Sequence, residues 1–194
     1  MTPPSPSDPD ALPPAVAPIP PRPDPFTVDA ITTMVDLLEP VERSLAEAVA
    51  VGDGELDLAS LAQVTGETVT AVLGALDVLA HVGLVRRTPD GRVIAAHAHV
   101  RRAMRDAMSR AECSRLHGAI ALALAGRGVD GAVIVTHIDA SGLAELAPWG
   151  VELALAAGMA AVDAGDDERA RVAFDRADRL AERGRAVRAD TRWR

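Results

Sequence analysis

The chain has 194 residues with a formal net charge of −8, and 48% of them are hydrophobic although only 2% are aromatic. Ala, Leu and Val must therefore fill the core of one or two small domains, and this composition predicts a mainly α protein. The negative charge argues against a protein that binds nucleic acid over its whole surface.

Targeting and redox features indicate a cytoplasmic protein. Cys113 is the single cysteine, which excludes an internal disulfide and is typical of a reducing compartment. The first residues show neither a basic nor an apolar segment of a secretion signal. No apolar run approaches the roughly 18 residues that a membrane span requires, so we expect no membrane association.

Residues 1–25 contain eleven of the fourteen prolines, with Ser and Asp between them. Such a composition cannot bury a core, and it predicts a disordered leader. Two helices are expected between residues 26 and 51. The first carries an apolar face and the second begins at Pro40, a residue that favours the first turn of a helix.

Residues 56–94 have the pattern of a winged helix-turn-helix. Apolar residues follow helical spacing on both sides of Thr65-Gly66, and Gly83 lies where a second helix would end. Val85 and Val93 then flank Pro89-Asp90-Gly91, a turn signal between two short strands. We therefore predict a winged helix-turn-helix domain with a small β-hairpin wing over residues 26–110.

The remaining sequence predicts helices. Residues 98–108 and 111–124 carry apolar stripes at helical spacing. Residues 131–140 favour a strand by residue type and a helix by spacing, and we choose a helix because the neighbouring elements are helical. A helix pair is expected at 146–164 and 167–183. Residues 111–183 thus form a helical segment, and residues 184–194 a basic tail that frays.

The order of these elements resembles the middle of large ATP-binding LuxR-family regulators of the STAND group, in which a winged helix leads into tetratricopeptide repeats. The resemblance covers about residues 27–182. It is carried by Gly83-Leu84-Val85-Arg86 with Asp90-Gly91-Arg92, by His97 with Val100, Arg101 and Ala103, and by Gly158, Ala170, Phe174 and Ala177, which match positions of a tetratricopeptide repeat.

Two parts of that family are missing from this sequence. A phosphate-binding loop requires a Lys, and the chain has none, so we expect no ATP binding and no cofactor. The C-terminal LuxR DNA-binding domain is absent as well. The resemblance therefore implies a fold and a transducing role, and it does not imply ATPase activity.

DNA binding by the winged helix is an alternative function. Reading the major groove requires Arg, Lys, Asn or Gln side chains on the recognition helix. Residues 67–80 offer Glu67, Thr68, Thr70 and Asp77, and no basic residue. Arg86, Arg87 and Arg92 in the wing are candidates for contacts with DNA phosphates. Three charges give modest affinity at physiological salt, so DNA binding is not favoured over a winged helix used for packing.

Other chemical sites are weak in this sequence. His97 and His99 lack the further ligands of a metal site, and Cys113 with His117 lacks the third group of a catalytic arrangement. We therefore expect no metal and no enzymatic activity. An arginine repeat at positions 169, 176 and 183 predicts a solvated face paired with Asp175, Asp178 and Glu182. A surface for an acidic partner or for nucleic acid is the alternative.

These observations predict a non-enzymatic regulatory or scaffolding module that acts by docking to a protein partner or by self-association. One helix pair cannot cover all of its own apolar surface. The face with Val151, Leu155 and Val162 differs from that with Leu146, Leu153 and Ala157, so one of the two is expected to be exposed or to pack on residues 116–124. Val151, Leu155 and Val162 are the candidate interaction residues. A free-standing winged-helix transcription factor is the alternative.

Overall fold

A computed structural model describes residues 25–191 of the chain, and the side chains of residues 29–186. The predicted leader, residues 1–25, lies outside the described residues except for Pro25. Within the described residues the protein is mainly α, as predicted, with nine α-helices, a short 3₁₀ turn and one two-stranded antiparallel sheet. The elements are α1 (Pro25–Asp36), α2 (Pro40–Gly52), α3 (Leu58–Thr65), α4 (Val69–His81), β1 (Val85–Arg87), β2 (Val93–Ala95), α5 (Ala98–Asp106), α6 (Arg110–Ala125), α7 (Gly131–Ser141), η1 (Ala144–Leu146), α8 (Ala147–Asp163) and α9 (Asp167–Thr191).

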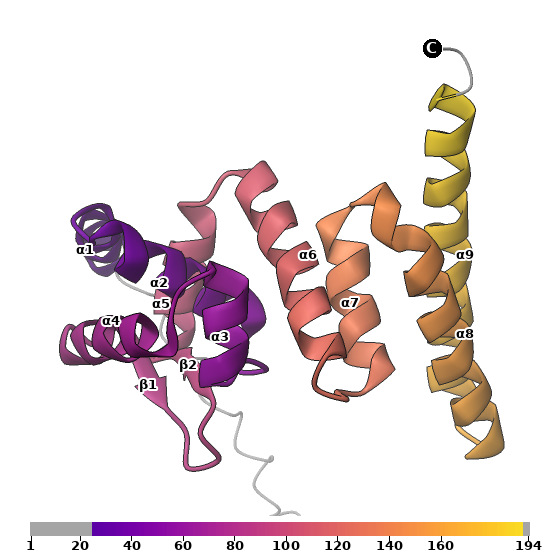
Figure 1. The fold of residues 1–194 in the computed structure, drawn as a ribbon, viewed down its shortest axis with the longest axis horizontal. Helices are drawn as coiled ribbons and strands as arrows, with labels where there is room; N and C mark the ends of the chain where they lie inside the picture. The colour runs from indigo at the N-terminus through magenta and orange to yellow at the C-terminus, as the bar shows by residue number, and fades with distance from the viewer. Residues whose placement is uncertain (1–24, 192–194) are drawn as a thin grey trace, which may run out of the picture.

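The predicted helix, turn, helix and hairpin follow one another from α3 to β2 (Figure 1). The side chain of Asp57 accepts the backbone N–H of Ser60 and so caps the first turn of α3. Gly66 ends α3 at a φ of 75°, a conformation that favours glycine, and Thr68 caps α4 three residues after α3 ends. Local sequence signals therefore account for the sharp turn between the two helices.

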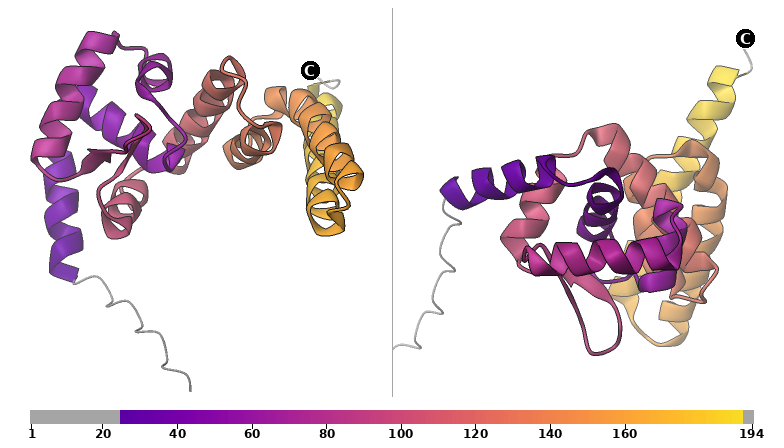
Figure 2. Two further views of the ribbon diagram at one scale, coloured as in Figure 1. Left: turned by 90° about the horizontal axis from the view of Figure 1, so that it is seen from below. Right: turned by 60° about the vertical axis from the view of Figure 1, so that its left-hand side comes forward.

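The hairpin pairs β1 with β2, and its loop projects away from the helices (Figure 2). The strands are antiparallel, with Val85 opposite Ala95 and Arg87 opposite Val93. Val85 and Val93 are buried, whereas Arg86 and Arg87 are exposed. Residues two apart in a strand share a face, so Arg87 lies on the same face as the buried Val85 and Val93, and Arg86 lies on the opposite face.

The core of the N-terminal half surrounds α2, which packs against α3, α4, α5, α6 and β2. Leu45 and Val49 of α2 are buried together with Leu61 of α3 and Leu76 of α4. Burial of about four such side chains stabilises the fold by several kcal/mol, because each contributes roughly 1.5–3 kcal/mol. This arrangement places α2 at the centre of the winged-helix part.

The C-terminal half is a stack of helices in chain order, α6 on α7, α7 on α8 and α8 on α9 (Figures 1 and 2). Residues 131–140 lie within α7, so the choice of helix over strand is confirmed. Gly158 permits the close approach of α8 and α9, since a Cβ there would lie 2.5 Å from a ring carbon of Phe174. Two of the residues that match positions of a tetratricopeptide repeat are therefore in close contact.

Two boundaries differ from the expectations. Helix α9 continues to Thr191, so the backbone of the predicted basic tail is helical from residue 184 to residue 191. The division of the chain at residue 110 stays a prediction, and α6, which begins there, packs on α2 and α3 as well as on α7. One helix is therefore shared by the winged-helix part and the helical stack.

The sequence predicts no apolar segment of membrane-spanning length, and this expectation is wrong: one helical segment meets the length and the composition of a membrane span. Ala144–Asp163 is 20 residues long with a mean hydropathy of 1.2, and among the described residues it is the one helical segment long and apolar enough to cross a membrane. A core helix of a soluble protein passes the same test. Here α7 and α9 pack on two sides of α8, an arrangement compatible with a soluble protein.

Candidate functional site

The wing arginines are largely engaged within the chain. Arg87 forms an ion pair with Asp77 of α4 at 3.3 Å, and Arg92 pairs with Asp90 at 3.0 Å. Arg86 is exposed, and the structure gives it no ion pair with any described residue. The three candidates for phosphate contacts therefore lie on one hairpin, but two of them have acidic neighbours that oppose an approaching phosphate.

The two histidines singled out for metal binding lie side by side. The rings of His97 and His99 are stacked, with centroids 5.3 Å apart and planes inclined by 6°. Within residues 25–191, no group of three His, Cys, Asp or Glu residues has the arrangement of a metal site. His97 instead occupies the position that precedes the first turn of α5.

A buried polar chain connects α6, α7 and the loop before α3. Nδ1 of His117 lies 2.8 Å from Nδ1 of His137, and Nε2 of His137 contacts the carboxylate of Glu55. Both histidines are buried. With Glu55 ionised and both rings neutral, His137 donates Nε2–H to Glu55, so its Nδ1 accepts Nδ1–H from His117. This tautomer assignment leaves Nε2 of His117 as an acceptor.

Burial and charge keep His117 in its neutral form. Burial is the largest cause that lowers the pKa of His117 from 6.5 to about 4, followed by the proximity of His137 and of Arg105, while Glu55 acts in the opposite direction. His117 is therefore uncharged near neutral pH, and the hydrogen-bonded chain from Glu55 to His117 joins the winged-helix part to the helical stack.

Sequence spacing did not reveal this chain of contacts. It placed Cys113 and His117 one helical turn apart, but the hydrogen-bond partner of His117 is His137, on the next helix. Glu55 lies 82 positions from His137 in the sequence. Pairing across such separations is fixed by the stacking of helices, so no local pattern in the sequence could have shown it.

A groove of about 680 Å³ opens beside His117, where α5, α6, α7 and α9 meet. We call it the junction groove, and its polar lining comprises Arg105, Arg110, Ser114, His117, Ser141 and Arg183, together with Asp139. Ser114 donates its hydroxyl to the backbone carbonyl of Ser141, which holds α6 and α7 together at the floor. Cys113 also lines the groove and is half-buried.

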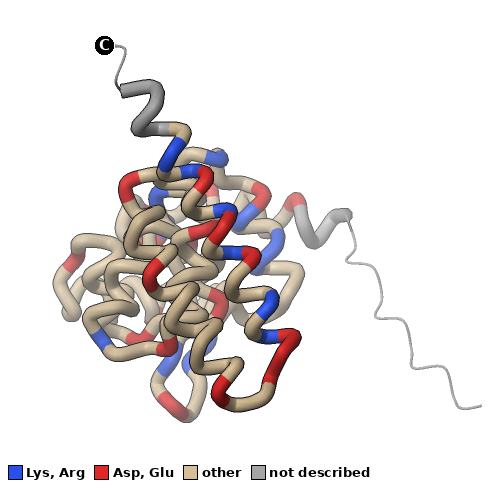
Figure 3. The backbone as a smooth tube through the Cα atoms, turned by 90° about the vertical axis from the view of Figure 1, so that its right-hand side faces the viewer, with Lys and Arg blue, Asp and Glu red and all other residues tan. Residues whose placement is uncertain are grey.

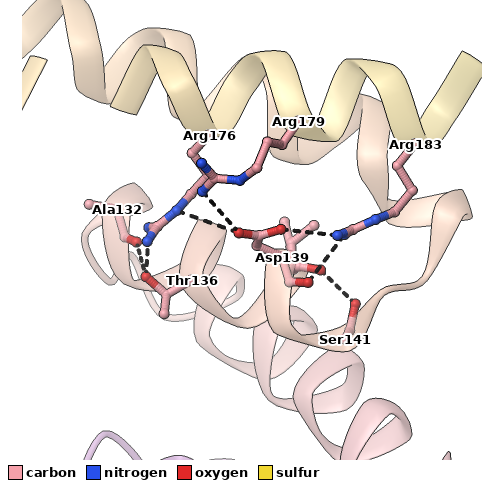
Figure 4. A network of polar contacts seen from close by, with 8 residues as sticks. Ala132, Thr136, Asp139, Ser141, Arg176, Arg179 and Arg183 are labelled. Atoms are coloured by element: carbon pink, nitrogen blue, oxygen red, sulfur yellow. Dashed lines mark hydrogen bonds and ion pairs between the residues drawn. The ribbon is translucent and has the colours of Figure 1, made fainter. Parts of the chain in front are cut away.

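Arg176 and Arg183 of the arginine repeat reach from α9 to α7 (Figure 4). Arg169 pairs with Asp130 at 3.1 Å, and Arg176 donates to the Thr136 hydroxyl at 2.9 Å. Arg183 donates both to the backbone carbonyl and to the carboxylate of Asp139, each at 3.1 Å. The predicted pairing with acids of the same helix is therefore wrong for these three arginines, although the side chain of Arg169 is exposed.

The predicted interaction face of α8 lies on the side opposite α7. Leu155 and Val162 are exposed to 46% and 49%, and Val151 is half-buried at the edge of a groove of about 330 Å³ between α8 and α9. We call the stripe Pro148, Val151, Leu155, Met159 and Val162 the open face of α8. These residues recur at helical spacing on one side of the helix.

The other predicted face is turned inward. Leu146, Leu153 and Ala157 are half-buried, and Leu153 lies beside Gly131 at the start of α7. Of the two faces, the one with Leu155 and Val162 is therefore left uncovered by the described residues. Figure 3 views the molecule from the end formed by α8 and α9 and shows charged positions of both signs along the chain there.

Comparisons of the chain with protein-family models, with curated proteins and with solved structures gave no match. The likeness to LuxR-family regulators accordingly stays an expectation from the sequence.

Proposed function

We propose that the protein is a non-enzymatic regulatory or scaffolding module that docks to an amphipathic helix of a protein partner. The observation that carries the proposal is the open face of α8, where Leu155, Met159 and Val162 are exposed to 46%, 57% and 49% along one side of a helix. Contiguous apolar side chains exposed in this way mark interaction sites.

The stacking of the chain itself argues that the occupant is a helix. Two sides of α8 are covered by α7 and α9, helix against helix, and the open face is the side that neither of them covers. The stripe from Pro148 to Val162 extends over roughly 21 Å at 1.5 Å per residue, which matches about four turns of a docked helix. Glu152 and Arg185 line the groove between α8 and α9 beside the open face. Their opposite charges favour a partner helix with charges of both signs beside its apolar stripe.

Docking is favoured over DNA recognition by the charges on α4. Its exposed positions include Thr70 and Asp77, and Asp77 pairs with Arg87 of the wing. A recognition helix without arginine, lysine, asparagine or glutamine lacks the side chains that make bidentate contacts with guanine or adenine. The role that we propose is that of the transducing part of a LuxR-type regulator, and the resemblance in the order of elements supports it.

The test compares two charge-introducing variants. Leu155→Glu with Val162→Glu alters the open face, whereas Leu122→Glu with Val78→Glu alters two apolar residues exposed elsewhere, to 53% and 42%. Sedimentation over a wide concentration range and the fluorescence of an apolar dye are measured for both variants and for the unaltered chain.

We expect the unaltered chain to self-associate or to bind the dye, and only the open-face variant to lose that property. Loss of self-association would identify a second copy as the source of the helix, and loss of dye binding by a monomer would indicate a different protein. A strictly monomeric chain that binds no dye, or equal losses in both variants, would overturn the proposal.

A further inference from the structure

The junction groove is lined by arginine and histidine side chains that have no part in docking through α8. It lies between the end of α5, the first turns of α6 and the end of α7, and Arg183 of α9 reaches its edge. The open face of α8 shares none of its lining residues. Its volume of about 680 Å³ is sufficient for a small molecule.

Positive charge is concentrated in this groove. Arg105, Arg110 and Arg183 line it, and Asp139 is the single carboxylate among its described lining residues. Asp139 already interacts with Arg176, Arg179 and Arg183 at 3.1–3.9 Å, so its charge is more than balanced. Within residues 29–186, Arg105 and Arg110 form no ion pair. A chain with a net charge of −8 thus keeps a local excess of unpaired cations in a concave surface.

His117 adds a titratable group to the same wall. Its Nδ1 is bonded to His137, while the ring as a whole lines the groove. Protonation at Nε2 would create a second donor without breaking the bond to His137, since Nδ1–H is retained. The charged groups that face His117 are Arg105 from α5 and Glu55 from the loop before α3, and the imidazole of His137 faces it from α7.

We propose that the junction groove binds a small dianionic oxyanion, a phosphate or a dicarboxylate, through Arg105, Arg110 and protonated His117. Guanidinium groups are suited to such ligands, because they present several N–H donors in the geometry of carboxylate and phosphate oxygens. A bound dianion also favours the protonated form of His117, so binding takes up a proton and becomes tighter as the pH falls. His117 is hydrogen-bonded to His137, and His137 contacts Glu55 of the winged-helix part. A ligand bound beside His117 is therefore connected to the contact between the winged-helix part and the helical stack.

The experiment measures binding by calorimetry, with sodium chloride at matched ionic strength as the baseline. Inorganic phosphate and succinate are the two probes of ligand chemistry, and sulfate, which stays dianionic over the range used, is the probe for pH dependence. Arg105→Gln and Arg110→Gln each remove one groove charge. Arg86→Gln removes one exposed charge from the wing and serves as the matched control.

We expect saturable binding of at least one probe. Arg105→Gln and Arg110→Gln should each weaken this binding about threefold to tenfold, and Arg86→Gln should leave it unchanged. The loss for each groove arginine is moderate because its hydrogen bonds to the anion are partly screened by solvent at an exposed site. Phosphate binding alone would indicate a phosphorylated ligand, and succinate binding a carboxylate ligand. Binding of neither probe above the chloride baseline, or equal losses in all three variants, would overturn the proposal.

The pH dependence separates the role of His117 from simple attraction by arginine. Sulfate should bind more tightly to the unaltered chain as the pH falls from about 8 to about 5, and this gain should be absent in His117→Asn. Thermal melts of each variant establish that it is folded. Parallel pH profiles for the two proteins would overturn the assignment of His117 to the site.

Discussion

Neutral His117 should make the protein sensitive to acid. In the unfolded chain this imidazole titrates near 6.5, whereas burial, His137 and Arg105 lower its pKa to about 4 in the folded protein. Between these values the unfolded state binds more protons, so the free energy of unfolding falls as the pH is lowered. The contribution is fully present above about pH 6.5 and is lost by about pH 4.

The size of the effect follows from the difference in pKa. One unit corresponds to about 1.4 kcal/mol, so lowering the pKa from 6.5 to about 4 corresponds to about 3 kcal/mol of stability. His117 is only 7% exposed, and solvent screening therefore removes little of this energy. For a small domain, about 3 kcal/mol is a large share of a total of roughly 5–15 kcal/mol.

Urea unfolding at a series of pH values measures this contribution. His117→Asn retains an amide N–H that can donate to Nδ1 of His137 but cannot ionise, and His81→Asn alters an exposed histidine as the control. We expect the free energy of unfolding of the unaltered chain and of His81→Asn to fall more steeply with acid than that of His117→Asn. Buffers without phosphate, sulfate or carboxylate keep the junction groove free of added oxyanions.

Acidic side chains also change the free energy of unfolding in this pH range. The decisive quantity is therefore the difference between His117→Asn and His81→Asn in how much free energy of unfolding each loses as the pH falls. That difference should reach about 2–3 kcal/mol between pH ~6.5 and pH ~4. Curves for His117→Asn and His81→Asn that differ only by a constant offset would refute the reasoning, because they would show that His117 titrates alike in the folded and unfolded states.

Two further predictions concern packing. Gly158→Ala should destabilise the protein by about 1 kcal/mol despite the better helix propensity of alanine, since the new Cβ would lie 2.5 Å from the ring of Phe174. Gly74→Ala, on open helix surface, should instead stabilise the protein by about 0.5–1 kcal/mol. Melting temperatures of the two variants that shift in the same direction would contradict this prediction. Leu76→Ala should cost about 2–5 kcal/mol because Leu76 is 1% exposed, and Thr70→Ala should cost less than about 0.5 kcal/mol; equal shifts of the urea midpoint would show that α4 is rotated relative to its place in the structure.

The parts of the fold that sequence reasoning predicted are those determined by neighbouring residues. Asp57 and Thr68 cap the two helices of the helix-turn-helix, and Gly66 supplies the left-handed residue between them. Pro89-Asp90-Gly91 forms the tip of the hairpin. Such signals act within one or two turns of the chain, so a single sequence carries them in full.

The polar contacts were beyond such reasoning because they depend on how separate helices pack. The repeat at Arg169, Arg176 and Arg183 correctly defines one face of α9. The spacing alone does not say that Thr136 and Asp139 of α7, and Asp130 just before it, lie opposite. Likewise, α9 extends to Thr191, through residues whose basic composition predicts a frayed tail. The same charges are compatible with the end of a helix, where cations interact favourably with its dipole.

The position of α6 explains why the winged-helix part and the stack are expected to respond together. Its N-terminal turns carry Cys113, Ser114 and His117 along the junction groove, while its later residues Ile120 and Leu124 are buried in the core. Glu55 belongs to the loop that begins the helix-turn-helix, and it holds His137 on the far side of α6. A shift of α7 relative to α2 and α3 would therefore separate Glu55 from His137 and leave a polar atom of the buried His137 ring without its partner, at a cost of about 1–3 kcal/mol. The polar chain thus opposes independent movement of the two halves, and a ligand in the junction groove would act at the end of that chain where His117 is still able to accept a proton.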